Sequence, residues 1–249
     1  MKKSFNIYLK GLLCLTVVLF LWACKKHKDI PPSYTKAKFT VSLKSGGSNI
    51  IWDSIHCLNA AANKYSVASA NFYISNIILK SPDGTVFTSK KIFFIDPKTA
   101  AKTTFSLDTI PPAEYSEISF LIGLESGRNT TFGLPTTTDN LNMAWPDAMG
   151  GGYHFMKLEG HYRDTLNVIK GYAIHLGKNE NLVSVKINQN LHQKYWDHDY
   201  SLYFDINEVF ANPYKYDLNF ETNYTMSDSV AMNRIKNNMS DAFSLHQNN

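Results

Sequence analysis

Alternation of apolar and polar residues dominates most of this chain. The segment AKFTVSLKS, residues 37–45, places an apolar side chain at every second position, as a strand with one buried face requires. The same pattern recurs in about eight to ten segments separated by turn residues, which is typical of an antiparallel sandwich or barrel. We therefore predict an all-β fold, an antiparallel β-sandwich. The other segments are 66–87, 90–97, 103–126, 153–163, 170–178, 182–189 and 200–210.

Two segments depart from this alternation. Residues 126–151 form a long stretch without a strand pattern, and long loops in compact domains are often functional. Near the end of the chain the apolar spacing becomes helical, and we predict a short C-terminal helix. The residues that carry this spacing are Val230, Ile235, Met239 and Phe243.

The N-terminus has the pattern of a targeting segment. Lys2 and Lys3 precede the apolar run GLLCLTVVLFLWA, which is too short to span a bilayer comfortably. The run ends in LWAC, which fits a bacterial lipoprotein processing site that leaves Cys24 as the lipidated first residue. Residues 1–24 are therefore predicted to be a lipoprotein signal peptide. The alternatives are plain secretion with cleavage elsewhere, or an uncleaved anchor.

Residues 25–36 are polar and contain a pair of prolines, so we expect a tether between membrane and domain. Residues 37–249 show neither a fixed repeat nor a second domain boundary, and we predict a single domain. This arrangement places the protein in the cell envelope, anchored by lipid, with the outer membrane as the expected membrane.

Charge and cysteine content exclude several classes of protein. The formal net charge is +4, and six lysines lie within the first 28 residues, so the remainder has no basic surface for nucleic acid. Cys57 is the cysteine left in the expected mature domain, so an intramolecular disulfide cannot form there. We also find no activated nucleophile or paired-carboxylate pattern, and we expect that the protein is not an enzyme.

Three histidines in residues 152–177 are candidate metal ligands. His161 and Glu159 share one face of a predicted strand, whereas His154 points to the other face. A change of one residue in the register of the hairpin decides which of the two histidines joins His175. The connection between the strands is too long to define that register, so both alternatives stay open.

The order of several motifs resembles the MbnP-like proteins. These are periplasmic or surface-attached copper-binding proteins linked to methanobactin, and many lipoprotein members occur in Bacteroidota. The resemblance covers about residues 37–245 and implies a β-sandwich that binds copper. Its motifs are NFYISNIILKSPDGTVF, FFIDP, IPPAEYSEISFLIGLESGRN, MAW, GYHFMKLEGH and YAIHLG.

The resemblance assigns roles to particular residues. His161 and His175 fall on its recurrent histidines, and Met143 and Trp145 match its Met-x-Trp element. Glu159 matches an acid expected to orient a neighbouring histidine. In some members the tryptophan is oxidised to kynurenine by a di-haem partner of the cytochrome c peroxidase type.

The copper site that the resemblance implies is not matched in full. Relatives often have a histidine in the stretch that reads TNYTM here, so we expect a weaker site or one with a replacement ligand such as His154. Imidazole with a thioether from Met143 or Met226 would favour Cu(I). We thus predict copper capture or buffering. The alternative is a metal-free module that binds a protein or glycan through residues 126–151.

Overall fold

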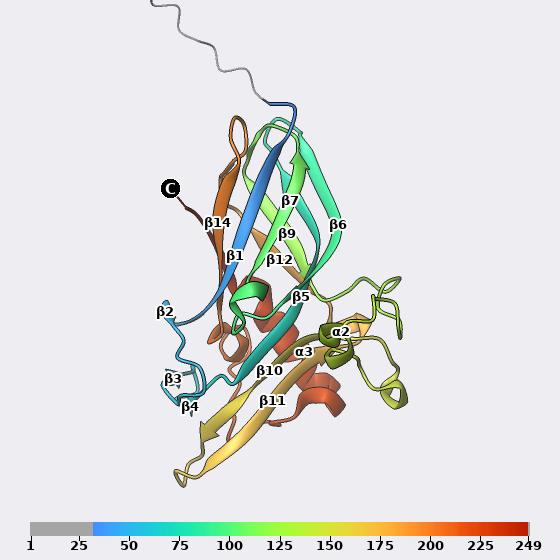
Figure 1. The fold of residues 1–249 in the computed structure, drawn as a ribbon. Coiled ribbons are helices and arrows are strands. Elements are labelled where there is room, and N and C mark those ends of the chain that lie inside the picture. The colour runs from blue at the N-terminus through green and yellow to red at the C-terminus, as the bar shows by residue number, and fades with distance from the viewer. Residues whose placement is uncertain (1–31, 249) are drawn as a thin grey trace, which may run out of the picture. The chain divides into compact units, whose positions relative to one another are not determined.

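The structure is a computed structural model that describes residues 32–248 (Figure 1). The predicted signal peptide, Cys24 and most of the predicted tether lie outside these residues. Strand β1 begins at Thr35, inside the range expected for the tether, and Thr35 is already buried. None of the helices in the described part of the chain is long and apolar enough to cross a membrane.

The smaller of the two main sheets has the order β15-β14-β1-β2, and β7 also pairs with β1. β1 and β14 run parallel, while the other pairs of this sheet are antiparallel. Its strands are β1 (Thr35–Ser45), β2 (Ser48–Asn49), β7 (Thr104–Ile110), β14 (His198–Asp205) and β15 (Phe243–Gln247).

The larger sheet has the order β12-β9-β5-β10-β4-β3, with β11 paired to β10 and β6 paired to β5. A short separate pair joins β8 (Glu114–Tyr115) to β13 (Leu191–His192). The strands of the larger sheet are β3 (Cys57–Leu58), β4 (Lys64–Tyr65), β5 (Ser69–Lys80), β6 (Val86–Ile95), β9 (Glu117–Ile122), β10 (His154–Arg163), β11 (Ile169–Gly177) and β12 (Val183–Ile187).

Apolar side chains from both sheets meet in one core. Phe72 of the larger sheet and Phe204 of the smaller sheet are fully buried, with ring centroids 5.6 Å apart. Phe243 stacks on Phe204 at 4.5 Å. Each such ring stabilises the fold by about 1.5–3 kcal/mol through burial. The alternation seen in the sequence is thus the alternation between this core and the outer faces, and the predicted β-sandwich is confirmed.

The C-terminal helix is confirmed, with different contacts from those expected. Helix α3 (Ser229–Asn238) begins where the side chain of Asp228 accepts a hydrogen bond from the Ala231 N–H. Val230 is exposed, and Phe243 lies in β15 rather than in the helix. The buried helix residues are Ala231, Met232, Ile235 and Asn238.

The predicted long loop contains helix α2 (Thr138–Asn142), which the sequence pattern did not indicate. The side chain of Thr137 caps it by accepting from the Asn140 N–H. Short 3-10 turns occupy other connections. They are η1 (Ala100–Lys102), η2 (Asp147–Met149), η3 (Asn179–Asn181), η4 (Glu208–Phe210), η5 (Thr225–Ser227) and η6 (Met239–Asp241).

Candidate metal centre

A β-bulge in the β10–β11 hairpin decides which histidines meet. His154 is opposite Gly177, whereas Met156 is opposite Leu176, so Phe155 is an extra residue in β10. Side chains alternate along a strand, and one extra residue turns His154 onto the face that carries His175. The register that the sequence left open therefore brings His154, and not His161, next to His175.

The imidazole rings of His154 and His175 lie edge to face, with centroids 5.0 Å apart. Both side chains are buried. His154 Nδ1 is 3.1 Å from the carbonyl oxygen of Met143. A carbonyl only accepts, so Nδ1 carries the hydrogen and Nε2 carries the lone pair. That Nε2 is buried without a hydrogen-bond partner among the described residues.

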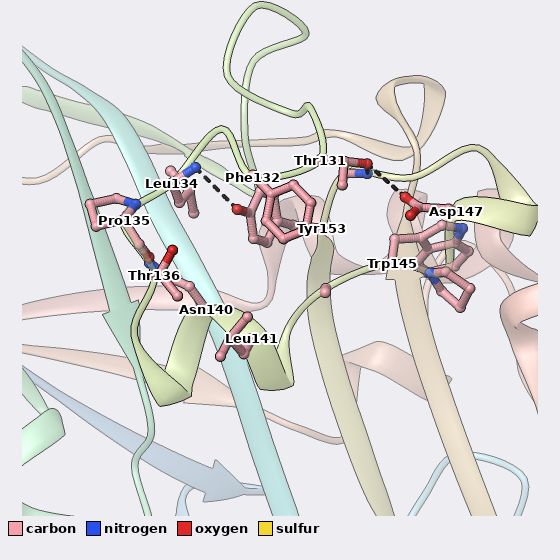
Figure 2. Close-up of a pocket in the computed structure, with 13 residues that line it drawn as sticks. Thr131, Phe132, Leu134, Pro135, Thr136, Asn140, Leu141, Trp145, Asp147 and Tyr153 are labelled. Atoms are coloured by element: carbon pink, nitrogen blue, oxygen red, sulfur yellow. Dashed lines mark hydrogen bonds between the residues drawn. The ribbon is translucent and has the colours of Figure 1, made fainter.

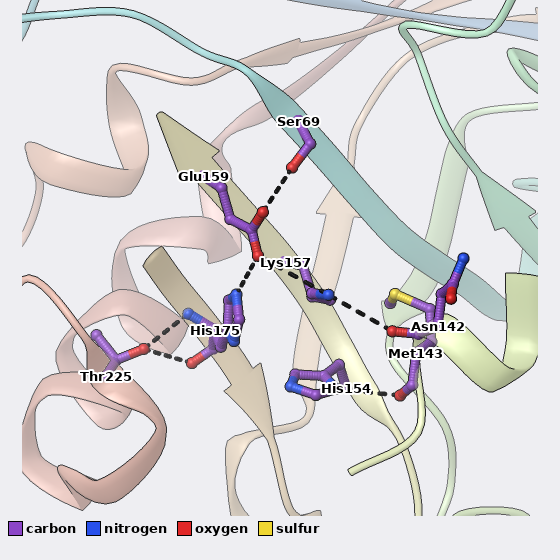
Figure 3. Close-up of polar contacts among 8 residues, drawn as sticks. All are labelled: Ser69, Asn142, Met143, His154, Lys157, Glu159, His175 and Thr225. Atoms are coloured by element: carbon purple, nitrogen blue, oxygen red, sulfur yellow. Dashed lines mark hydrogen bonds and ion pairs between the residues drawn. The ribbon is translucent and has the colours of Figure 1, made fainter. Parts of the chain in front are cut away.

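His175 is held through Nε2, whereas His154 is held through Nδ1 (Figure 3). Its Nε2 lies 2.7 Å from Glu159 Oε1, so Nε2 donates to the carboxylate and Nδ1 keeps the lone pair. Within residues 32–248, Nδ1 has no hydrogen-bond partner either. Thr225 of η5 fixes the main chain of His175, because its hydroxyl accepts from the His175 N–H at 2.8 Å and donates to the His175 carbonyl at 2.6 Å.

The charges at this centre follow from burial and contact. Burial, and to a smaller extent the neighbouring His175, lower the pKa of His154 to about 4. The hydrogen bond from His175 lowers the pKa of Glu159 to about 2, despite the opposing effect of burial. At neutral pH the centre therefore holds a neutral His154 imidazole beside an ionised Glu159 carboxylate.

Trp145 closes one side of the centre. Its ring centroid lies 4.6 Å from that of His154, and the main chain of Trp145 is held by an N–H bond to the Gly152 carbonyl. A Cβ at Gly177 would fall 2.4 Å from Trp145 Cε3, so the indole lies directly on a strand position that has no side chain. Trp145 Nε1 is buried and unpartnered within the described part of the chain.

Other predicted ligands lie elsewhere. His161 is exposed and pairs with Gly171. It lies four residues along β10 from Lys157, the residue that pairs with His175. At about 3.3 Å per residue that separation is roughly 13 Å. The Met143 side chain is buried in a small apolar cluster with Tyr153 and Phe155, and its contribution to the centre is the carbonyl on His154.

Met226 follows Thr225 and is half-buried against the main core. Among residues 32–248, no group of three or more His, Cys, Asp or Glu side chains is gathered for a metal. The centre is therefore a pair of imidazoles with outer contacts, rather than a cage of several charged ligands.

Residues 126–151 form a cavity of about 250 Å³ beside the centre (Figure 2). Tyr153, directly before β10, accepts from the Leu134 N–H, and within the loop the Thr131 hydroxyl donates to Asp147. Trp145 lines this cavity and also contacts His154, so the same ring separates the cavity from the histidine pair.

Three contacts of the centre escaped the sequence analysis. Ser69 donates to Glu159 Oε2 at 3.1 Å, Lys157 lies 3.8 Å from Glu159 Oε1, and Thr225 fixes His175. These residues lie on β5, β10 and η5 and meet only through sheet pairing. One signal was readable for Thr225, because it lies in the TNYTM stretch in which the family resemblance led us to expect a ligand.

The donor set fits a copper ion. The two imidazole rings lie 5.0 Å apart, and each has one buried nitrogen without a partner in the described residues. A neutral imidazole nitrogen of this kind is a metal ligand. The Glu159–His175 contact is the carboxylate–histidine arrangement that supports metal-bound histidines.

The two packed sheets and the buried histidine pair define a β-sandwich protein with a candidate metal centre. The chain belongs to the MbnP family, because the family model MbnP matches residues 28–233. Membership confirms the predicted relationship and supports a metal-associated, extracytoplasmic function in general terms.

One solved structure shows the same fold. MbnP from Methylosinus trichosporium matches with a TM-score of 0.59 and 13% sequence identity, over 88% of this chain and 100% of that chain. At this identity the match establishes the fold and not the ligands. A search of curated proteins finds no match.

Proposed function

We propose that this protein binds one copper ion outside the cytoplasm and captures or buffers it there, with His154 and His175 as ligands. The observation that supports this most directly is the pair of buried imidazoles whose lone-pair nitrogens have no partner in the described residues. A buried polar nitrogen without a partner costs about 1–3 kcal/mol, so a bound cation would recover a cost that the fold bears.

Copper suits the pair better than zinc does. Zinc sites in proteins usually take four ligands, three of them from the protein even where one position stays open. The described residues offer two imidazoles and no cluster of three or more acidic, cysteine or histidine side chains. Cu(I) accepts imidazole together with soft thioether ligands, and Met226 lies close in sequence to Thr225, which contacts His175.

Trp145 and its partner belong to the same proposal. The family resemblance implies oxidation of this tryptophan by a di-haem partner of the cytochrome c peroxidase type. The support in this chain is that the Trp145 ring lies 4.6 Å from His154 with its N–H unpartnered in the described residues. Mass measurement of protein isolated from its native host tests the modification, and an unmodified Trp145 would remove this part of the proposal.

The anchor and the place of action are also proposed. Cys24 would carry the lipid and hold the domain at the cell envelope, with the outer membrane as the expected location. The support is the LWAC sequence that ends the apolar run. We further propose binding without catalysis, because the centre presents ligands and no activated nucleophile within the described residues.

Copper competition tests the central proposal. Protein purified without an affinity tag is titrated against a chromophoric Cu(I) chelator at neutral pH, together with His154→Ala, His175→Ala and the double variant. We expect one copper per wild-type chain, a large loss in each single variant and no measurable competition by the double variant. His161→Ala is the matched control and should compete as the wild type does.

Two outcomes would reject the proposal. Wild-type protein that acquires no copper after loading would exclude copper binding by this chain. Loss of copper in His161→Ala with retention in the double variant would move the site away from the buried pair. Separately, displacement of copper by zinc from the wild type would contradict the preference for copper over zinc that we inferred from the number of ligands.

A second candidate function rests on the cavity in residues 126–151. Phe132 and Leu141 line it and are 78% and 52% exposed, and exposed apolar side chains around a cavity are typical of a contact surface. A metal-free module that binds a protein or glycan there is the alternative. Failure of copper loading in an intact, folded protein would favour it.

A further inference from the structure

Glu159 occupies a position from which it can reach His175. In the sheet its direct neighbours are Ser69 on β5 and Ala173 on β11, and both have small side chains. His175 lies opposite Lys157, one step along the same face and diagonal to Glu159. Diagonal pairs in antiparallel strands lie within reach of long side chains. The small neighbours leave the carboxylate free to lean towards His175.

Both oxygens of the Glu159 carboxylate have partners (Figure 3). Oε1 accepts from His175 Nε2 at 2.7 Å and lies 3.8 Å from Lys157 Nζ, while Oε2 accepts from the Ser69 hydroxyl at 3.1 Å. The carboxylate is thus fixed from β5 as well as from β10. Its contact with His175 therefore has one defined direction.

The two histidines expose different nitrogens for different reasons. His154 donates from Nδ1 to a main-chain carbonyl, so its free nitrogen is Nε2. His175 donates from Nε2 to a side chain, so its free nitrogen is Nδ1. The acceptor for His154 is the main-chain carbonyl of Met143, which no side-chain substitution removes. The contact of His175 depends on Glu159 alone.

We propose that Glu159, itself held by Ser69, is the positioning residue that makes His175 present Nδ1 to the metal, opposite Nε2 of His154. This inference rests on the proposed copper function of the histidine pair. It adds which nitrogen each histidine uses and which residue imposes that choice. Without the carboxylate, His175 has a second ring orientation and a second tautomer available, and Nδ1 is no longer the nitrogen that stays free for a metal.

Imidazole nitrogen-15 NMR of the copper-free protein at pH 7.5 tests the choice of nitrogen directly. In the wild type we expect His154 with its hydrogen on Nδ1 and His175 with its hydrogen on Nε2. Glu159→Ala should leave the His154 pattern unchanged and give His175 a mixture of both tautomers. Glu159→Gln, whose amide oxygen still accepts a hydrogen bond, should retain most of the Nε2–H form.

Copper affinity supplies the second measurement. Loss of an outer contact to a metal-bound histidine typically lowers affinity by about 10–100-fold. We expect a loss of copper affinity in that range for Glu159→Ala and a smaller loss for Glu159→Gln. Ser69→Ala should cause the smallest loss of the three. Glu125→Gln, a change of the same kind on another segment, should alter neither tautomers nor affinity.

The results separate the two proposals. If Glu159→Ala mixes the tautomers of His175 as stated but the wild type takes up no copper, the copper function fails, while control of the His175 tautomer by Glu159 stands. If copper binds and Glu159→Ala changes neither the His175 tautomer nor the affinity, the positioning role is wrong and the copper function stands. A chemical-denaturation curve for each variant confirms that any loss arises in folded protein.

Discussion

Acid should destabilise the copper-free protein through His154. Burial lowers the pKa of this side chain to about 4 in the folded state, whereas an unfolded chain has the ordinary value of 6.5. At pH values between these two pKa values, the His154 side chain binds a proton in the unfolded state but not in the folded state. The stability contributed by neutral His154 is therefore complete above pH 6.5 and is lost progressively as the pH falls towards 4.

The size of the effect follows from the same two values. Each pKa unit corresponds to ~1.4 kcal/mol, so pKa values of about 4 and 6.5 set a limit of about 3 kcal/mol. Between pH 7.5 and pH 5 the expected loss is about 2 kcal/mol, because His154 is then almost fully protonated in the unfolded chain only. That loss is a large fraction of the stability of an ordinary domain, about 5–15 kcal/mol.

Chemical denaturation at pH 7.5 and pH 5 measures this loss. His154→Phe replaces the ring by one of similar size that does not titrate, and its stability should change by about 2 kcal/mol less than that of the wild type over the same interval. His161→Phe, an exposed position on the same strand, should retain the wild-type dependence. An equal loss of stability in the wild type and in His154→Phe would refute the reasoning.

Three further predictions concern other contacts. Gly177→Ala should cost about 1–3 kcal/mol and shift the fluorescence of Trp145, since the new Cβ would lie 2.4 Å from its ring, whereas Gly171→Ala on the same strand meets ordinary contacts and should be close to neutral. Thr225→Val should lower the free energy of unfolding by about 2–3 kcal/mol, because it removes the two buried hydrogen bonds between the Thr225 hydroxyl and the main chain of His175. Thermal or chemical unfolding measures this loss. Cys24→Ser should abolish metabolic labelling with a fatty-acid analogue and release the protein from the membrane fraction, and unchanged labelling would contradict lipidation at this residue.

The strands were predictable because each depends mainly on its own residues. Alternation in segments such as 37–45 and 170–178 reflects one buried face, and that face is visible without knowledge of the partner. The partner itself was not predictable. β1 pairs in parallel with β14, from Ala37 opposite His198 onwards, across more than half of the chain. Pairing of such distant segments depends on the whole core, which local patterns do not encode.

The C-terminal helix shows where a periodic pattern misleads. Val230, Ile235, Met239 and Phe243 have helical spacing, but the helix ends at Asn238. A 3-10 turn at Met239–Asp241 then reverses the chain, and Phe243 enters β15 to stack on Phe204. Phe243 is apolar because β15 buries it, and its helical spacing from Met239 is therefore a coincidence. Val230, assigned to the buried face, is 63% exposed.

The sequence indicated His154, His175, Glu159 and Trp145 but not which histidine joins His175, and the bulge at Phe155 explains why. Strict alternation places His154 on the face of Met156, away from His175. Gly123 has φ of +118° and no side chain, and a Cβ there would lie 2.4 Å from the Phe155 ring, so this ring fills the space that the glycine leaves. That packing buries Phe155 beside Tyr153 and makes room for an extra residue in β10. A glycine more than thirty positions earlier in the chain thus accommodates the residue at the bulge, and the bulge places His154 on the face that carries His175.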